Sequence, residues 1–135
     1  MDVPKIPPGM TPAGLVEVGR QYRAAGRAVE AFATFTIVTT NAPEVATGWS
    51  GLGLAAFDLA LYPQAADAFA RAVALLPDDA ILWRNLGDVR MLGGGTSGGA
   101  IEALERAVAL DPAMVAAWDD LGTSYLGVWG RAGDS

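Results

Sequence analysis

Two pairs of neighbouring carboxylates, Asp78-Asp79 and Asp119-Asp120, come closest in type and spacing to a catalytic arrangement. Paired carboxylates can divide the roles of general acid and general base when an apolar environment moves their pKa values apart. Here each pair stands near the predicted start of a helix, where anionic side chains interact favourably with the helix dipole. We therefore interpret both pairs as helix caps and solvated surface.

Other groups that commonly carry catalysis or bind metals are missing from the composition. The chain has no histidine and no cysteine, which excludes disulfides, thiol chemistry, histidine-ligated zinc and catalysis by an imidazole base. We expect the chain not to be an enzyme and to need neither a cofactor nor a metal ion.

The glycine-rich segment 93–99 is a candidate for a loop that cradles a phosphate group. A P-loop, however, has Lys followed by Ser or Thr after its last glycine, and a β-strand before it. In this chain Ala100 and Ile101 follow the segment, and a predicted helix precedes it. We interpret the segment as a flexible connection between two helices rather than as a nucleotide site.

The bulk composition predicts one folded domain. Of the 135 residues, 52% are apolar and 18% are charged, a balance that suits a folded core and differs from that of disordered chains. The net charge is −6 and the nine basic residues are dispersed, which argues against a nucleic-acid partner because phosphate neutralisation needs clustered Lys and Arg. The Arg- and Ala-rich composition favours a bacterial source.

The chain shows no signal for export or for a membrane. Its first residues lack the apolar core of a secretory signal, and no window approaches the roughly 18–20 continuous apolar residues of a membrane span. We expect a cytoplasmic protein without a membrane partner.

A short motif recurs along the chain at a regular interval. The pattern Trp-x-x-Leu-Gly begins at Trp49, Trp83 and Trp118, at steps of 34 and 35 residues, and a degenerate copy begins at Leu15. Further positions recur in phase with it: Ala31, Ala65 and Ala100; Phe35, Phe69 and Leu104; and Pro43, Pro77 and Pro112. Repetition at such a period indicates stacked supersecondary units.

This pattern resembles that of the tetratricopeptide repeat over about residues 12–129. The resemblance implies an all-α fold, a right-handed superhelical solenoid of three helical hairpins and a C-terminal capping helix, seven helices in all. We expect a Pro-rich N-terminal arm at 1–11, hairpins at 12–45, 46–79 and 80–114, and a capping half repeat with its tail at 115–135.

Local signals agree with these helices. Thr11, Asp79 and Asp111 are predicted N-caps, and Pro112 takes a first-turn position that proline favours. Arg90 occupies a slot where other repeats pack a residue inward. We expect its stem to lie along the core and its head to reach water, and a ligand-anchoring role is the alternative.

In the family that the chain resembles, the first helix of each hairpin lines a concave inner face. The corresponding positions form the candidate peptide-binding groove, and they are Val16, Arg20, Arg23, Ser50, Leu54, Phe57, Ile81, Arg84, Asp88, Met91, Asp119 and Thr123. The apolar centre of this groove consists of Leu54, Phe57, Ile81 and Met91. Its arginines suit acidic groups of a ligand, and its aspartates, with nearby Asp120, make the other end negative. The alternative for each position is a solvated groove wall.

One subtype of the family, the carboxylate clamp that holds chaperone C-termini, is not expected. It needs Lys and then Asn on the first inner helix, Asn on the second, and Lys and Arg on the third. The matching positions here are Val16, Arg20, Gly51, Ile81 and Asn85. A positive charge and one asparagine are all that remain of the pattern.

Together these features predict a non-catalytic scaffold or adaptor that binds a peptide segment with hydrophobic anchors. One alternative is a chaperone similar to those of type III secretion, which shelter translocator segments. Another is a homo-oligomeric scaffold joined through the last helix, whose Tyr125, Leu126, Val128 and Trp129 leave apolar surface exposed when no helix follows.

Overall fold

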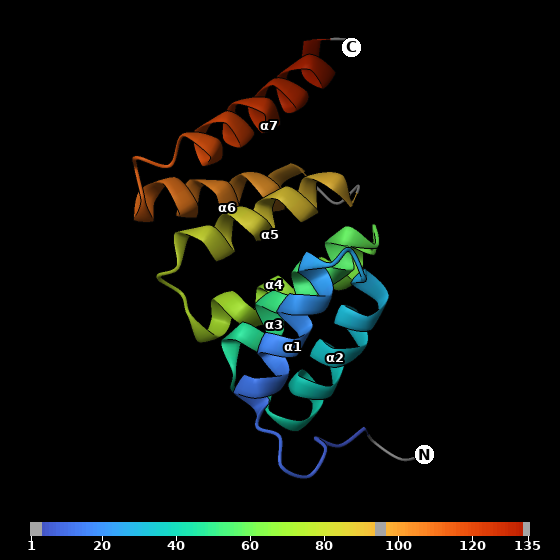
Figure 1. Cartoon of the computed structure of the whole chain (residues 1–135). Coiled ribbons are helices and arrows are strands. Elements are labelled where there is room, and N and C mark those ends of the chain that lie inside the picture. Colours follow the sequence, from blue (N-terminus) through green and yellow to red (C-terminus); the bar gives the residue numbers. More distant parts are fainter. Residues whose placement is uncertain (1–3, 94–96, 134–135) are drawn as a thin grey trace. The chain divides into compact units, whose positions relative to one another are not determined.

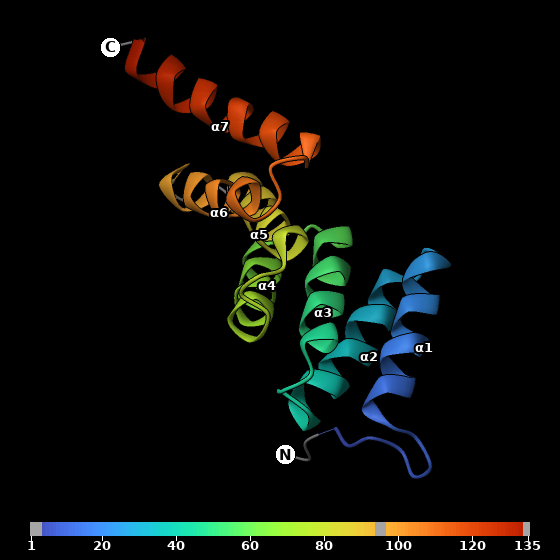
Figure 2. The ribbon, with the colours of Figure 1, turned by 90° about the vertical axis from the view of Figure 1, so that its left-hand side faces the viewer.

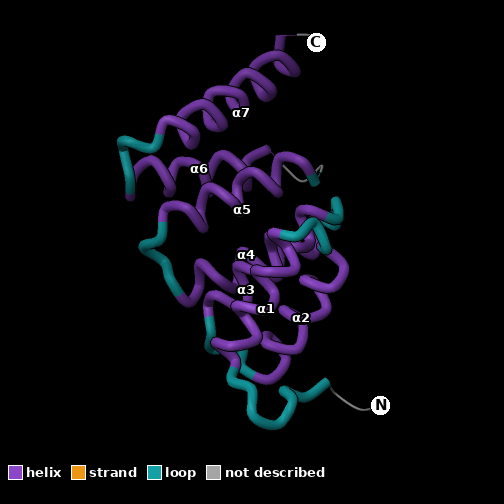
Figure 3. Tube along the Cα trace, in the orientation of Figure 1, coloured by secondary structure: helices purple, strands orange, loops and turns teal. Residues whose placement is uncertain are grey.

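The computed structural model describes the backbone of residues 4–93 and 97–133, and the side chains of residues 4–93 and 99–127. Within these ranges the chain forms helices and loops and no β-strand (Figure 3). The helices are α1 (Pro12–Ala24), α2 (Ala28–Asn41), α3 (Ala46–Asp58), α4 (Tyr62–Leu75), α5 (Ala80–Leu92), α6 (Ser97–Leu110) and α7 (Val115–Gly133) (Figure 1). The prediction of an all-α fold with seven helices is thus confirmed. Of the connection predicted at 93–99, residues 94–96 lie outside the described residues, whereas residues 97–99 form the start of α6 and correct that part of the prediction. The side chains of Val128 and Trp129 also lie outside the described residues.

The chain divides into two compact units, which we describe separately. The first unit comprises Met1–Leu76 and contains α1 to α4; the second comprises Pro77–Ser135 and contains α5 to α7. Within each unit, helices that follow one another in sequence pack side by side (Figure 2). The repeat pattern does not predict this division, because the motif recurs at nearly the same interval throughout.

The core of the first unit forms where aromatic rings meet glycines. Phe35 of α2 is 1% exposed and packs between α1 and α3. A Cβ atom added to Gly51 would lie 2.2 Å from Cε1 of Phe35, and one added to Gly19 would lie 2.6 Å from its Cζ. In the next hairpin Phe69 packs on Gly53 in the same way, and a Cβ atom added to Gly53 would lie 2.8 Å from Cε1 of Phe69. Glycine is therefore required at these positions by the close approach of the helices.

The core of the second unit follows the same rule with an aliphatic residue. Leu104 of α6 is fully buried, and its Cγ would lie 2.6 Å from a Cβ added to Gly87 of α5. Leu104 also belongs to a cluster with Ala117 and Leu121 of α7, so that α6 packs against both of its neighbours.

A hydrogen bond explains why Trp and Pro recur in phase. The indole Nε1–H of each repeated tryptophan donates to the carbonyl oxygen of the proline six residues before it. The pairs are Trp49 to Pro43 at 2.7 Å, Trp83 to Pro77 at 2.7 Å, and Trp118 to Pro112 at 2.9 Å. Since an indole N–H can only donate, this bond satisfies the polar atom of a ring that otherwise packs against apolar neighbours.

Two of the three predicted N-caps are confirmed. The side chain of Thr11 accepts from the backbone N–H of Gly14 at 3.0 Å, and that of Asp79 accepts from Leu82 at 3.2 Å. Asp111 is a correction, because its carboxylate accepts from Ala113, two residues on, and α7 begins only at Val115. Asp111 stabilises the turn before the helix, which also contains Pro112, and does not cap the helix itself.

Arg90 also differs from its prediction. Its Nη1 donates to the backbone carbonyl of Gly99 at 3.1 Å, so the head of the side chain also binds the first turn of α6, a contact that the sequence did not predict. This contact ties the end of α5 to the start of α6 on either side of the glycine-rich segment.

Candidate functional site

A hollow of about 560 Å³ lies in the first unit on the side formed by α1 and α3. Four of the predicted groove residues line it: Arg20 and Arg23 from α1, and Ser50 and Leu54 from α3. Gly51 and the buried ring of Phe35 contribute to its floor, so the close contact that joins α2 to α3 also shapes the hollow. The structure thus brings together polar, cationic and apolar side chains from two successive repeats.

One rim of this hollow is held by an ion pair. Arg23 donates to Asp58 through two nitrogens, Nε to Oδ2 at 2.7 Å and Nη2 to Oδ1 at 3.3 Å. Such a two-point contact between a guanidinium and a carboxylate fixes orientation as well as distance. The charge of Arg23 is therefore matched within the chain, and we no longer assign it to a ligand.

Arg20 lies on the same hollow in a different environment. Its side chain is 60% exposed, and its Nη1 stands 3.9 Å from Oε2 of Glu17. An exposed pair at that distance contributes little, because water screens both charges. Arg20 can therefore turn toward an anionic group that enters the hollow.

Val16 and Phe57 lie outside this hollow. Val16 is 4% exposed and packs in the core with Leu15 and Phe35, so it is not accessible to a ligand. The register of the motif is correct in this helix, because Gly19 meets Phe35 as Gly53 meets Phe69. The groove assignment of Val16 is nevertheless wrong, because its apolar side chain packs into the core. Phe57 is 38% exposed and packs edge-on against Tyr62 of α4, with ring centroids 5.9 Å apart, at the turn between α3 and α4.

In the second unit, the predicted apolar residues are in different settings. Ile81 is 62% exposed near the start of α5. Met91 is half-buried, and its sulfur accepts from the hydroxyl of Ser124 on α7 at 2.7 Å. Met91 therefore joins α5 to α7 and does not extend freely toward a ligand.

The charged residues of the second unit form a cluster that joins α5 to α7. Nε of Arg84 lies 2.9 Å from Oδ2 of Asp120 and 3.6 Å from Oδ2 of Asp88. Although partial burial works against the charged form of Arg84, its hydrogen bond to Asp120 and the two nearby carboxylates raise its pKa. The guanidinium is matched by its own chain, so we withdraw it, too, as a ligand contact.

Asp88 carries the largest shift in this cluster. Burial raises the pKa of its carboxyl group, the hydrogen bond and charge of Asp120 raise it further, and Arg84 lowers it, which together bring it to about 7. Within the described residues its Oδ1 is buried without a hydrogen-bond partner. When Asp88 is protonated its carboxyl group can donate a hydrogen bond, and a hydrogen bond with Asp120 is among the causes of the raised pKa.

The two remaining predicted residues lie on α7. Asp119 and Thr123 are exposed, and the hydroxyl of Thr123 donates to the carbonyl of Asp119 at 3.0 Å. They belong to the second unit and accompany Asp120 on its helix.

Sequence reasoning missed the ion pairs that occupy Arg23 and Arg84. In both, an arginine on one first-position helix meets an aspartate on the next, 35 residues later at Asp58 and 36 residues later at Asp120. Opposite charges separated by about one repeat length were the signal that could have identified them.

No helix in the described part of the chain is long and apolar enough to cross a membrane. The described side chains also contain no group of three or more acidic residues placed to hold a metal ion.

Solved structures with the same architecture are known. The chain is similar to the first TPR of Spaghetti (RPAP3) bound to the HSP90 peptide SRMEEVD, with 22% identity, a TM-score of 0.82, and coverage of 87% of this chain and 92% of that one. It is similar to MamA, with 27% identity, a TM-score of 0.84 and coverage of 90% and 71%. The Sgt2 TPR domain from Aspergillus fumigatus shows 21% identity, a TM-score of 0.81 and coverage of 92% and 82%.

Comparison of the sequence itself leads to the family. No curated protein matches the chain. A family model described as Tetratricopeptide repeat matches residues 19–80 and 51–115. The two matches together span more than half of the 135 residues, and the chain therefore belongs to the tetratricopeptide repeat family.

Proposed function

We propose that this chain is a non-catalytic scaffold that binds a peptide segment of a partner protein, with the hollow between α1 and α3 as the principal contact. The observation that supports this is the convergence of Arg20, Ser50 and Leu54 on one hollow of about 560 Å³. Its volume lies within the roughly 300–1,000 Å³ that is usual for sites that hold small ligands.

The chemistry of the lining defines the ligand. Leu54 offers an apolar wall, and the exposed guanidinium of Arg20 lies on the same hollow. A peptide that places an apolar side chain against Leu54 and an acidic group near Arg20 satisfies both. We propose this arrangement of an apolar anchor and a neighbouring carboxylate as the recognised feature.

The affinity that follows is moderate. Each buried apolar anchor contributes about 1.5–3 kcal/mol, and association costs at least about 4 kcal/mol. Four anchors at the upper value give near −8 kcal/mol, a dissociation constant on the order of micromolar, and fewer anchors give weaker binding. Such an affinity suits reversible assembly.

The peptide seen with Spaghetti is not what we propose here. That protein shares the fold with this chain at 22% identity. Of the five positions that match the family's carboxylate clamp, three hold residues without an amide or ammonium side chain, namely Val16, Gly51 and Ile81. The proposed ligand therefore need not end in a free C-terminal carboxylate.

Selection from a displayed library of random 12-residue peptides, followed by fluorescence anisotropy, tests this proposal. Leu54→Asp should weaken selected peptides at least tenfold, because it puts a charge where the anchor packs. Arg20→Glu should weaken those that carry an acidic residue. Val29→Asp is the matched control, since Val29 is 66% exposed and does not line the hollow.

Circular dichroism must show the same helicity for all variants. If every selected peptide binds Leu54→Asp as tightly as the unmodified chain, the hollow is not the binding site.

A further inference from the structure

A different surface, on α7, is left open by the helix packing of the second unit. In α3 and α5, the repeated Trp and Gly lie beneath the second helix of their own hairpin. In α7 the same positions are held by Trp118 and Gly122. This surface belongs to the second unit and does not depend on the hollow between α1 and α3.

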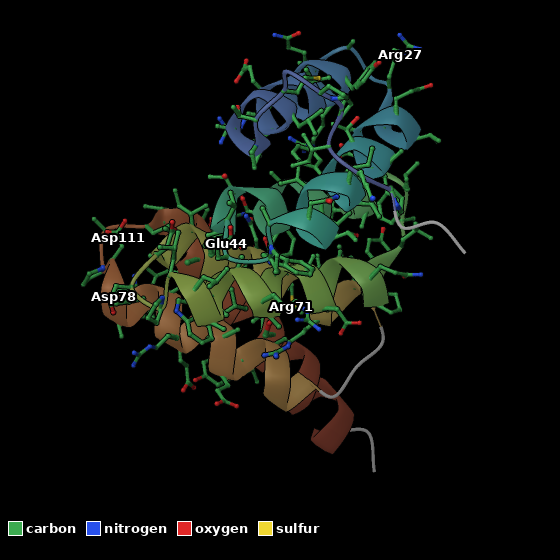
Figure 4. The ribbon with its side chains drawn as sticks, turned by 90° about the horizontal axis from the view of Figure 1, so that it is seen from below. Arg27, Glu44, Arg71, Asp78 and Asp111 are labelled. Carbon is green, nitrogen blue, oxygen red and sulfur yellow. The ribbon has the colours of Figure 1, made fainter. Side chains whose placement is uncertain are left out.

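The two hairpins whose first helix carries the repeated tryptophan, α3 with α4 and α5 with α6, show what covers these positions. Phe69 of α4 packs on Gly53, and Leu104 of α6 packs on Gly87. Two residues after each of these anchors an arginine follows. Its guanidinium lies over the tryptophan ring of the first helix, at 4.9 Å for Arg71 over Trp49 and 5.9 Å for Arg106 over Trp83. Figure 4 labels Arg71 on α4.

Both covering helices also carry a small residue four positions before the anchor. It is Ala65 in α4 and Ala100 in α6, and both are fully buried. The covering helix therefore has the pattern Ala, then Phe or Leu four residues later, then Arg two residues after that. The anchor and the arginine each have a defined contact on the first helix.

On α7 the corresponding contacts are open. Among the described residues, no atom beyond α7's own helix backbone lies within 4 Å of a Cβ added to Gly122. Trp118 is 50% exposed, although its indole N–H is bound to Pro112. Tyr125 and Leu126, one turn further along, are 46% and 73% exposed. We call Trp118, Gly122 and Tyr125 the open face of α7.

Charge favours a basic residue over this face. The hydroxyl of Tyr125 is hydrogen-bonded to the carboxylate of Glu105 on α6, and Glu105 and Asp119 are both exposed. An arginine placed over Trp118 would gain a cation–π contact, and the exposed Asp119 is the next residue in the sequence.

We propose that the open face of α7 docks an amphipathic helix from a partner protein, one that carries the Ala, Phe or Leu, and Arg pattern of α4 and α6. A second copy of this chain does not supply such a helix in its folded state. Its own anchors Phe35, Phe69 and Leu104 are between 0% and 1% exposed, because each is already packed in its own hairpin. The proposed helix belongs to a partner protein whose anchor residue is exposed.

The chain provides its own probe. A peptide with the sequence of residues 62–76, blocked at both ends, contains the full pattern of α4. We expect it to bind the intact chain with a dissociation constant in the high micromolar range, since a short peptide must first become helical. Peptides with Phe69→Asp or Arg71→Glu are the matched controls, and each should bind at least tenfold more weakly in a titration followed by fluorescence anisotropy.

Gly122→Leu is the matched protein variant. The new leucine side chain enters open space, and the substitution replaces a glycine within a helix by a better helix former. The variant should therefore fold at least as well as the unmodified chain. The variant should nevertheless bind the peptide at least tenfold more weakly, because the leucine side chain fills the space that the anchor residue of the peptide would occupy. Leu54→Asp should leave this binding unchanged, which separates the present proposal from the peptide site in the first unit.

Three results would overturn the proposal. The first is the absence of binding, and the second is equal binding to Gly122→Leu, which would mean that the peptide displaces α4 from its own hairpin. The third is a dimer in sedimentation experiments that Gly122→Leu abolishes and the peptide does not compete with, which would assign the open face to a second copy of the chain.

Discussion

At the scale of single residues, the environment of Asp88 differs most from what its type alone suggests. An aspartate on the inner face of such a repeat is ordinarily solvated and charged. Here α5 and α7 bring Asp88 and Asp120 together beside Arg84, and one guanidinium faces two carboxylates. The raised pKa of Asp88 therefore follows from the contact between the two helices.

The stability of the second unit should depend on pH through this group. The pKa of Asp88 is raised from 3.8 to about 7, so between these values the folded state holds a proton that the unfolded state has lost. Stability therefore falls as pH rises from about 4 to about 7, and the whole loss is present above that.

Asp88→Asn tests this dependence. The amide has no charge to bury and can donate to Asp120, so the variant should be more stable than the unmodified chain at pH 8 by about 1 kcal/mol, a value reduced for partial exposure. The difference should vanish near pH 4 in urea unfolding curves. Asp119→Asn, on an exposed neighbour, is the control, and an equal effect in both variants would contradict the prediction.

At the scale of helices, the repeated glycine has a different role in complete and incomplete hairpins. Gly53 and Gly122 occupy the same position of the motif. A Cβ on Gly53 would meet three ring atoms of Phe69 at 2.8–2.9 Å, whereas one on Gly122 would meet nothing within 4 Å among the described residues. The same residue type is thus held by packing in one helix and not in the other.

Alanine at these two positions should shift stability in opposite directions. Replacing glycine within a helix contributes about 1 kcal/mol of helix propensity. For Gly122→Ala this gain stands alone, and we expect a higher melting temperature. For Gly53→Ala it is offset by about 1–3 kcal/mol of overpacking against a buried ring, so we expect a net loss. Thermal unfolding followed by circular dichroism compares the two variants. A change of melting temperature with the same sign in both would show that packing of the second helix does not determine whether glycine is required at this position.

At the scale of the whole chain, the helices group into two compact units, Met1–Leu76 and Pro77–Ser135. In repeat proteins each element contacts mainly its neighbours, so stability is approximately a sum of local terms. A destabilising substitution in one unit should therefore lower the stability of that unit and leave the stability of the other unit unchanged.

Phe69→Ala examines this grouping. It removes a ring that is 1% exposed in the first unit and should cost that unit about 3–5 kcal/mol. In native-state hydrogen exchange, the amides of α3 and α4 should lose protection while those of α5 and α6 retain theirs. Equal loss throughout the chain would show that both units unfold as one.

The sequence alone determined the all-α fold and the order of its helices. Trp, Gly, Ala and Pro recur in phase because each has a fixed partner within one hairpin or its preceding turn, as the bond from Trp83 to Pro77 shows. The caps at Thr11 and Asp79 were predictable for the same reason, since their partners lie three residues away.

Tertiary structure decided which of the inner-face residues remain available to a ligand. Arg23 and Arg84 are paired with aspartates about one repeat length away, and Val16 turned into the core. The titration of Asp88 depends on a helix that begins 27 residues later. Such properties arise from contacts between helices, whose distances depend on how side chains pack, and a motif read within one helix carries no measure of them.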